Sequence, residues 1–130
     1  MRKLKLLLVL LCAIAVPAYA AKSTESAYSL SDLDQVKSIP TFGRFDNWHE
    51  LGSDALIVWA SPGRPYLIKL TRPSYDLRFV QQIAITSTVG QVVAHFDSVL
   101  VDGLPYRIES IYKLDRPTAK ELISSAHRTT

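Results

Sequence analysis

Short apolar runs separated by turn-forming residues dominate the chain after residue 54. The first two runs cover residues 55–60 and 66–70, and Pro62-Gly63 lies between them. Proline fixes φ and glycine tolerates unusual backbone angles, so this dipeptide favours a tight turn and the pattern predicts a β-hairpin. Because the run 55–60 is apolar at every position, we expect its strand to be central in a sheet and covered on both faces.

Two further hairpins are predicted on similar grounds. One joins the runs 83–88 and 91–97 through Val89-Gly90. The other turns at Asp102-Gly103, a strong hairpin signal, before residues 106–108. Consecutive hairpins imply an antiparallel β-meander of about five to six strands, either a curved sheet or a small barrel.

Two helices are expected to flank these strands. Apolar residues recur at near-helical spacing over residues 30–39, which predicts a short N-terminal helix that ends before Pro40. Near the C-terminus, four apolar residues lie at i, i+3, i+4 and i+7, namely Ala119, Leu122, Ile123 and Ala126. This spacing predicts an amphipathic helix, for which Asp115 and Pro117 supply start signals. The predicted class is therefore α+β, with one domain over residues 30–130.

Two connecting segments have no clear period. Residues 41–47 are rich in turn formers and aromatic residues, and we expect them to wrap an edge of the sheet. Residues 76–80 lack the alternation of a strand and are expected to form a helical turn between strands.

The first twenty residues have the pattern of a secretory signal peptide. A basic head over residues 1–5 precedes eleven apolar residues at 6–16, and Ala18-Tyr19-Ala20 fits an A-x-A cleavage site. The apolar run is too short for a membrane-spanning helix, which needs roughly 20 residues. We therefore expect cleavage after Ala20, export to the periplasm or beyond, and no stable membrane anchor afterwards. Residues 21–29 are small and polar and are predicted to be a flexible lead-in.

Removal of this segment changes the composition of the chain. Cys12 is the only cysteine, and because Leu11 precedes it where a lipoprotein site needs a small residue, we favour ordinary cleavage. The exported chain would then hold no thiol and would depend on an apolar core rather than on disulfides. Cleavage also removes three of the 15 lysines and arginines but none of the 12 acidic residues, which leaves a formally neutral chain. Its charges are interspersed, so we do not expect nucleic-acid binding.

His95 and Asp97 are the main candidates for chemistry. They lie two positions apart on a predicted strand, so their side chains would project from one face and could act in catalysis or ligate a metal. Alternating polar residues on a half-solvated strand explain the pair more simply, and no third ligand lies near in sequence. We therefore assign no catalytic, metal or cofactor site, and keep His95 and Asp97 as candidates for an enzymatic alternative.

Other enzyme motifs are incomplete. His49-Glu50 begins like a zinc-protease motif, but Ser53 stands where the second histidine would be needed. No serine lies in a G-x-S-x-G turn, and the five glycines are scattered singly rather than gathered in a phosphate-binding loop.

Aromatic residues and an arginine gather around the first predicted hairpin. We expect Trp48 and Trp59 to belong to the core, as large aromatic side chains usually do. Arg64 and Tyr66 are the best candidates for an exposed contact surface, because arginine and tyrosine often anchor interfaces.

Five segments carry a family resemblance, namely Leu56-Ile57-Val58, Arg64-Pro65-Tyr66-Leu67-Ile68, Pro73-Ser74-Tyr75-Asp76-Leu77, residues 92–99 and Pro105-Tyr106-Arg107-Ile108. Through them, residues 48–114 resemble a family of small secreted bacterial proteins that is catalogued only as a domain of unknown function. Members often carry cysteines where Ser74 and Tyr106 stand, and sometimes one at Val93. The resemblance implies that any disulfide or metal-bound thiol of the family is absent from this chain, and it implies export and the fold without an activity.

Size and incomplete catalytic motifs favour an exported, non-enzymatic binding or structural module of the bacterial envelope. Its partner would be an unknown protein or envelope component, bound through the sheet face or the first hairpin. The alternatives are a small periplasmic hydrolase or metal-dependent enzyme that uses His95 and Asp97, and an inhibitor of a secreted enzyme with a protruding loop at 61–65. A pocket that gathers His95 and Asp97 with another titratable residue would favour the enzyme, whereas exposed Arg64 and Tyr66 on a convex surface would favour binding.

Overall fold

A computed structural model describes residues 29–41 and 45–128 of the 130-residue chain. The predicted signal peptide, Cys12 and all but the last residue of the predicted lead-in lie outside the described residues. In chain order the described elements are the 3-10 turn η1 (Leu30–Asp32), β1 (Asp34–Val36), β2 (Ser38–Pro40), β3 (Asn47–Glu50), β4 (Ala55–Ser61), β5 (Arg64–Leu70), β6 (Ala84–Ile85), β7 (Gln91–Val93), β8 (Ser98–Val101), β9 (Leu104–Lys113) and the helix α1 (Arg116–Arg128).

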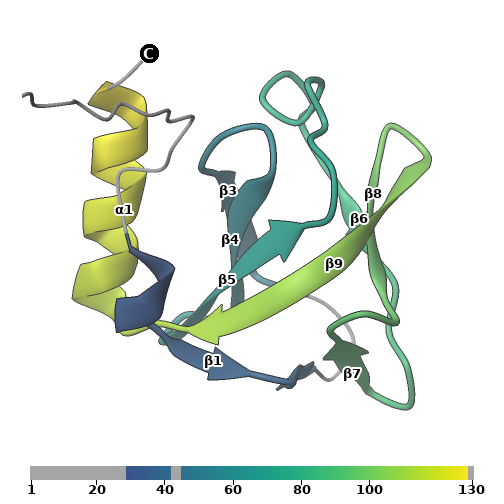
Figure 1. Ribbon diagram of the computed structural model, residues 1–130, viewed down its shortest axis with the longest axis horizontal. Coiled ribbons are helices and arrows are strands. Elements are labelled where there is room, and N and C mark those ends of the chain that lie inside the picture. Colours follow the sequence, from purple (N-terminus) through teal and green to yellow (C-terminus); the bar gives the residue numbers. More distant parts are fainter. Residues whose placement is uncertain (1–28, 42–44, 129–130) are drawn as a thin grey trace, which may run out of the picture.

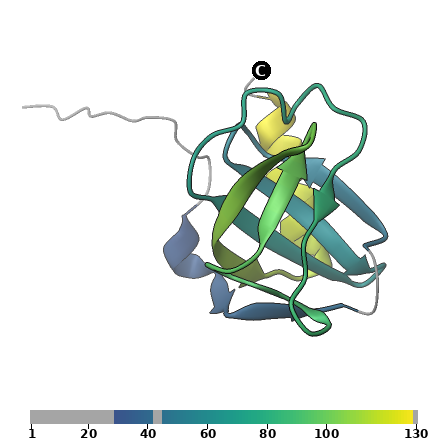
Figure 2. The ribbon, with the colours of Figure 1, turned by 90° about the vertical axis from the view of Figure 1, so that its right-hand side faces the viewer.

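Six strands form a curled half-barrel in the order β3-β4-β5-β9-β8-β6 (Figures 1 and 2). β1 extends this sheet by pairing with β9, and β2 pairs with β7 in a separate two-stranded sheet. All of these pairings are antiparallel. The helix α1 lies against the outer side of the half-barrel (Figure 1). The predicted antiparallel sheet with a C-terminal helix is thus confirmed.

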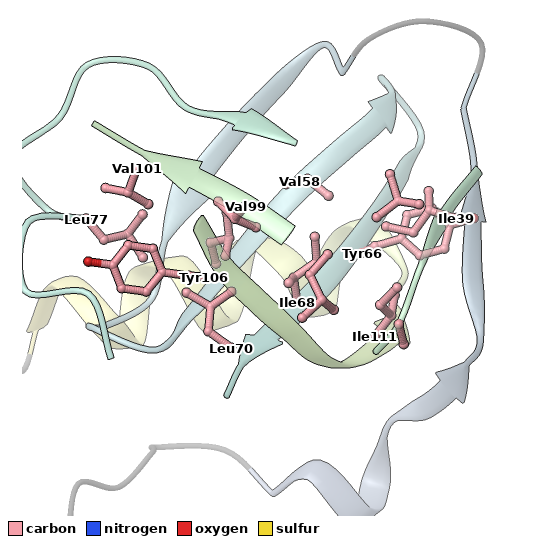
Figure 3. Packing of buried hydrophobic residues seen from close by; sticks show 14 residues of the cluster. Ile39, Val58, Tyr66, Ile68, Leu70, Leu77, Val99, Val101, Tyr106 and Ile111 are labelled. Carbon is pink, nitrogen blue, oxygen red and sulfur yellow. The ribbon is translucent and has the colours of Figure 1, made fainter. Parts of the chain in front are cut away.

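Two apolar clusters lie on opposite faces of the sheet. The inner core fills the curl of the half-barrel (Figure 3) and consists of Ile39, Leu56, Val58, Tyr66, Ile68, Leu70, Leu77, Val92, Ala94, Val99, Val101, Tyr106, Ile108 and Ile111. The outer core lies between the sheet and α1 and consists of Ala55, Ile57, Leu67, Tyr112, Leu114, Ala119 and Leu122. β4 contributes to both clusters because successive side chains of a strand point to opposite faces. The prediction of a central strand covered on both faces is confirmed.

β9 also serves both cores, through a break in its register with β5. The pairing shifts between Lys69 and Leu70, whose partners are Ser110 and Ile108. Such a bulge places an extra residue in one strand and reverses the alternation of faces beyond it. As a result Ile108 and Ile111, three positions apart, both enter the inner core.

The predicted N-terminal helix over residues 30–39 is wrong. Only the short turn η1 forms there, and the chain continues as β1 and β2. Leu30 and Leu33 pack against the outer core, whereas Val36 and Ile39 pack into the inner core. The apolar stripe of a helix packs against one partner. These four side chains pack against two separate clusters, and an extended chain can reach both.

The second predicted hairpin is right at its turn and wrong in its arms. Val89 and Gly90 both have positive φ, at 50° and 75°, and the backbones of Thr88 and Gln91 exchange two hydrogen bonds across them. Beyond this turn the arms separate, because β6 pairs with β8 and β7 pairs with β2. The N-terminal segment, expected to be helical, supplies the strand that β7 pairs with.

Three further local predictions are confirmed, whereas residues 42–44 of the segment expected to wrap a sheet edge lie outside the described residues. Pro62-Gly63 joins β4 to β5, and Asp102-Gly103 joins β8 to β9 with positive φ at both residues. Residues 75–79 form consecutive turns, in which the Phe79 amide donates to the Asp76 carbonyl at 2.8 Å.

The C-terminal helix α1 begins at a side-chain cap. The Asp115 carboxylate accepts a hydrogen bond from the Thr118 amide at 2.8 Å, and the hydrogen bonds from Thr118 lower the pKa of Asp115. Ala119 and Leu122 are the buried residues of the helix and seal the outer core. Within the described part of the chain, no helix is both long and apolar enough to cross a membrane.

Candidate binding pocket

A pocket of about 740 Å³ lies where the half-barrel remains open between β3 and β6. We call it the seam pocket. Its described lining residues are Thr41, Phe45, Asp46, Asn47, Trp48, Val58, Ile83, Ala84, Ile85, Ser87, Gly90 and Val92. Because β3 and β6 are the two ends of the strand order, residues from distant parts of the sequence form its opposite walls.

Apolar side chains make up much of this lining. Val58 and Val92 are fully buried members of the inner core. Phe45, Trp48 and Ile83 are half-buried, and each packs against the inner core while also lining the pocket. The walls therefore rest on the packed interior, which favours a pocket that exists before a ligand arrives.

Backbone hydrogen bonds hold one wall in place. The Thr41 amide donates to the Gly90 carbonyl at 3.1 Å, which links the end of β2 to the turn before β7. The Asp46 amide donates to the Trp59 carbonyl at 2.8 Å, which fixes the entry to β3 against β4. The Trp48 amide donates to Asn47 Oδ1 at 2.8 Å, so this amide of a terminal strand is bonded within β3 itself.

His95 and Asp97 do not share a strand face. β7 ends at Val93, and residues 94–96 form a turn in which His95 has a φ of 74°. His95 is exposed, whereas Asp97 is only 3 % exposed. The expected strand through residues 91–97 is wrong here, because the turn intervenes and places one side chain outside and the other inside.

The Asp97 carboxylate is fully engaged by its neighbours. Oδ1 accepts from the Thr86 hydroxyl at 2.8 Å, and Oδ2 accepts from the Val93 amide at 2.7 Å. The Thr88 hydroxyl lies 3.1 Å from each carboxylate oxygen. These bonds tie the segment before β7 to the turn that follows β7, which is a structural role. Among the described residues, no group of three His, Cys, Asp or Glu side chains could hold a metal ion.

Arg64 and Tyr66 lie in different environments. Arg64 is exposed beside the turn between β4 and β5, as expected. Tyr66 is only 5 % exposed, so the expectation that it contributes to an exposed surface is wrong. It alternates with Ile68 and Leu70 along β5, and all three point into the inner core (Figure 3). The loop proposed for an inhibitor is a tight hairpin turn, with Ser61 paired to Arg64.

The two tryptophans pack on opposite sides of the sheet. Trp48 packs against the inner core and lines the seam pocket, whereas Trp59 packs against the outer core. Both are half-buried and pack against these clusters from outside, whereas full membership of the core was expected. The Trp59 indole nitrogen is buried without a hydrogen-bond partner among the described residues.

A second pocket of about 460 Å³ is lined by residues of the segments 50–53 and 74–79 and by one residue of α1. We call it the loop pocket. Its described lining residues are Glu50, Leu51, Gly52, Ser53, Ser74, Tyr75, Arg78, Phe79 and Ala126. Tyr75 and Phe79 are 74 % and 75 % exposed, so the aromatic residues of this pocket stand mostly in solvent rather than forming apolar walls.

The seam pocket was not predicted from the sequence. Its two walls come from residues 45–48 and 83–87, which lie far apart in the chain and meet only through the curl of the sheet. One local signal was present, since the aromatic residues of segment 41–47 indicated a wrapped sheet edge. Nothing in the pattern of residues 83–87 distinguished a pocket wall from an ordinary strand.

Comparison with known proteins gives a family without an activity. A family model described as Family of unknown function (DUF6491) matches residues 1–130, which confirms the resemblance found in the sequence. No curated protein and no solved structure matches the chain.

Proposed function

The chain belongs to this family of unknown function, and we propose that it is an exported, non-enzymatic binding module that holds the apolar part of a ligand in the seam pocket. The observation that carries the proposal is the seam pocket itself, about 740 Å³ of space whose lining joins half-buried aromatic and aliphatic side chains with the exposed polar residues Asp46, Asn47 and Ser87. Small-molecule sites commonly occupy roughly 300–1,000 Å³ and have mainly apolar walls with a few polar groups.

The walls supply a favourable interaction for an apolar ligand. Trp48, Ile83 and Ile85 are each partly buried and still line the pocket, so part of their apolar surface is available to a ligand. Covering apolar surface contributes roughly 25 cal/mol per Å². A ligand that fills the pocket gains this contribution from walls that are already packed on the inner core.

The arrangement of titratable residues favours binding over hydrolysis. Neither the seam pocket nor the loop pocket includes His95 or Asp97. The Asp97 oxygens already accept hydrogen bonds from Thr86, Thr88 and Val93. A carboxylate committed in this way is poorly placed to act as a base or to orient the exposed His95.

A neutral fluorescent probe tests the proposal. We expect N-phenyl-1-naphthylamine to bind with saturable fluorescence enhancement, because its rings can occupy the seam pocket. Ala84 is exposed and lines the pocket, so Ala84→Trp should obstruct the pocket and weaken binding at least tenfold. Ser124→Trp adds the same side chain at an exposed position of α1 outside the pocket and should leave affinity unchanged.

The same assay tests whether His95 takes part in binding. His95→Ala should bind the probe as the unaltered protein does, because His95 lies outside the pocket lining. Equal binding by the Ala84→Trp and Ser124→Trp variants, or the absence of saturable binding, would overturn the proposal.

Export rests on the N-terminal sequence pattern and has its own test. Mass spectrometry of the protein recovered from the periplasm or medium should give a chain that begins at Ala21. A lipid-modified chain that begins at Cys12, or an uncleaved chain retained in the cytoplasm, would contradict export of a soluble module.

A further inference from the structure

One wall of the seam pocket is built on a very short strand. This wall comes from residues 83–92, in which β6 covers only Ala84–Ile85. Beyond β6, residues 86–90 are exposed, and the Thr86 amide donates to the Ser98 carbonyl at 3.0 Å. A strand of two residues gives little ladder support, so the position of this wall depends on further contacts.

The threonines of this wall make those contacts without lining the pocket. Ile85 and Ser87 belong to the described lining, whereas Thr86 and Thr88, which alternate with them, do not. Successive side chains of an extended chain point to opposite sides. The hydroxyls of Thr86 and Thr88 bond instead to the carboxylate of Asp97. The contacts that hold this segment therefore leave the lining free for a ligand.

Asp97 gathers hydrogen-bond donors from the whole length of this wall. Oδ1 accepts from the Thr86 hydroxyl at 2.8 Å, and Oδ2 accepts from the Val93 amide at 2.7 Å. The Thr88 hydroxyl lies 3.1 Å from each oxygen. Asp97 is almost fully buried, so water competes little for these bonds. Each donor is the sequence neighbour of a lining residue, namely Ser87 for the two threonines and Val92 for Val93.

We propose that Asp97 is a positioning residue of the seam pocket. Its carboxylate holds the wall at residues 85–93 in the conformation that a ligand contacts, although Asp97 itself is not part of the described lining. A wall that is fixed in advance does not have to be ordered when the ligand binds, and this preorganisation raises affinity. The inference rests on the proposed function, because it assigns a role in binding to a residue outside the same pocket.

Replacement of the carboxylate tests this role. Asp97→Asn keeps one acceptor oxygen, and we expect it to weaken binding of N-phenyl-1-naphthylamine about three- to tenfold at a temperature where the protein stays folded. This range corresponds to the loss of about one hydrogen bond. Asp102→Asn makes the same chemical change at an exposed turn residue outside the pocket, where asparagine tolerates the positive φ. This control should bind the probe as the unaltered protein does.

A second variant removes the donor instead of the acceptor. Thr86→Val keeps the volume and the branching of the side chain but releases both the Asp97 carboxylate and the Ser98 amide. We expect it to weaken probe binding about two- to fivefold. Because Thr86 is exposed and outside the described lining, this variant also supplies the test if Asp97→Asn does not fold.

Two further measurements separate positioning from stability. Asp115→Ala removes the cap of α1 on the other side of the sheet, and it should bind the probe unchanged while it stays folded. In ¹⁵N spectra of ligand-free Asp97→Asn, exchange broadening should appear at the amides of Ser87 and Gly90 in the wall, and the amide of Leu67 in β5 should stay sharp. A purely structural role would move neither affinity nor these wall amides in the folded protein.

The outcomes distinguish this inference from the proposed function. If the folded Asp97→Asn and Thr86→Val proteins bind as tightly as Asp102→Asn, if Asp115→Ala weakens binding as much as Asp97→Asn, or if the wall amides stay as sharp as those of β5, the positioning role is wrong while the pocket remains a binding site. If the unaltered protein shows no saturable binding, or if Ala84→Trp binds as tightly as Ser124→Trp, the proposed function fails together with this inference.

Discussion

The Thr86 hydroxyl donates a 2.8 Å hydrogen bond to the buried carboxylate of Asp97, eleven residues further along the chain. The same hydroxyl oxygen accepts a 2.9 Å hydrogen bond from the Ser98 amide. Thr86 therefore bridges the carboxylate and the start of β8. This network holds the segment that leaves β6 and the turn that precedes β8 in a fixed relation, and that segment includes Ser87 of the seam pocket.

Loss of the Asp97 carboxylate should destabilise the fold. Asp97→Ala leaves the Val93 amide and two threonine hydroxyls without their acceptor, and we expect a loss of about 2–4 kcal/mol in the free energy of unfolding. Asp97→Asn keeps one acceptor oxygen and should cost less. Urea unfolding monitored by tryptophan fluorescence measures both values. Asp102→Asn is the control and should change stability by less than about 0.5 kcal/mol. An Asp97→Ala protein as stable as this control would refute the structural role of Asp97.

Val89 should be a strained residue whose replacement stabilises the protein. It is 92 % exposed and has a φ of 50°, a region that β-branched residues strongly disfavour. Two-residue turns with positive φ at both positions prefer Asn-Gly, and Gly90 already occupies the second position. Val89→Asn should therefore raise the free energy of unfolding by about 1 kcal/mol, since almost no packing is lost. Calorimetric melting compares the two proteins, and an unchanged or lower Tm would show that Val89 is not strained.

The helix cap at Asp115 should give stability that depends on pH. Hydrogen bonds from Thr118 lower the pKa of Asp115 below its usual 3.8 in the folded state. A carboxyl with a depressed folded pKa stabilises the protein above its unfolded pKa, and this contribution disappears as the pH falls through the folded pKa. Asp115→Ala should thus lower the Tm at pH 7, and the difference from the unaltered protein should vanish when Asp115 is protonated.

The variant Asp115→Asn separates the charge from the hydrogen bond. Asparagine also caps helices well, so this protein should keep most of the Tm at pH 7 and lose the pH-dependent part. A Tm difference between Asp115→Ala and the unaltered protein that is the same at pH 7 and in acid would contradict the role assigned to the ionised cap.

Local patterns predicted the structure correctly where the signal lies within one short segment of the chain. The uniformly apolar run at 55–60 predicted a strand buried on both faces, and β4 has that character because its alternate residues enter the inner and outer cores. Asp102-Gly103 predicted a hairpin because turn geometry depends on those two residues alone. The C-terminal helix followed from the spacing of Ala119 and Leu122 and from the cap at Asp115.

The failures at residues 30–39 and at the seam pocket have a different cause, because both depend on contacts between distant segments. Residues 30–39 have a helical spacing by coincidence, since Leu33 and Ile39 serve separate clusters that exist only after the sheet has curled. The 94–96 turn gives no sequence signal, because the residue at the positive φ is His95 rather than glycine. The seam pocket lies between the two ends of the strand order, so no single segment contains its pattern.

The most direct test of the seam pocket is a two-dimensional ¹⁵N NMR titration with the neutral probe 3-phenylpropanol. We predict saturable shift changes that are largest at the amides of Trp48, Ile85 and Val92, which line both walls of the pocket. Largest changes at Tyr75 and Phe79 of the loop pocket, or the absence of saturable changes, would contradict the account.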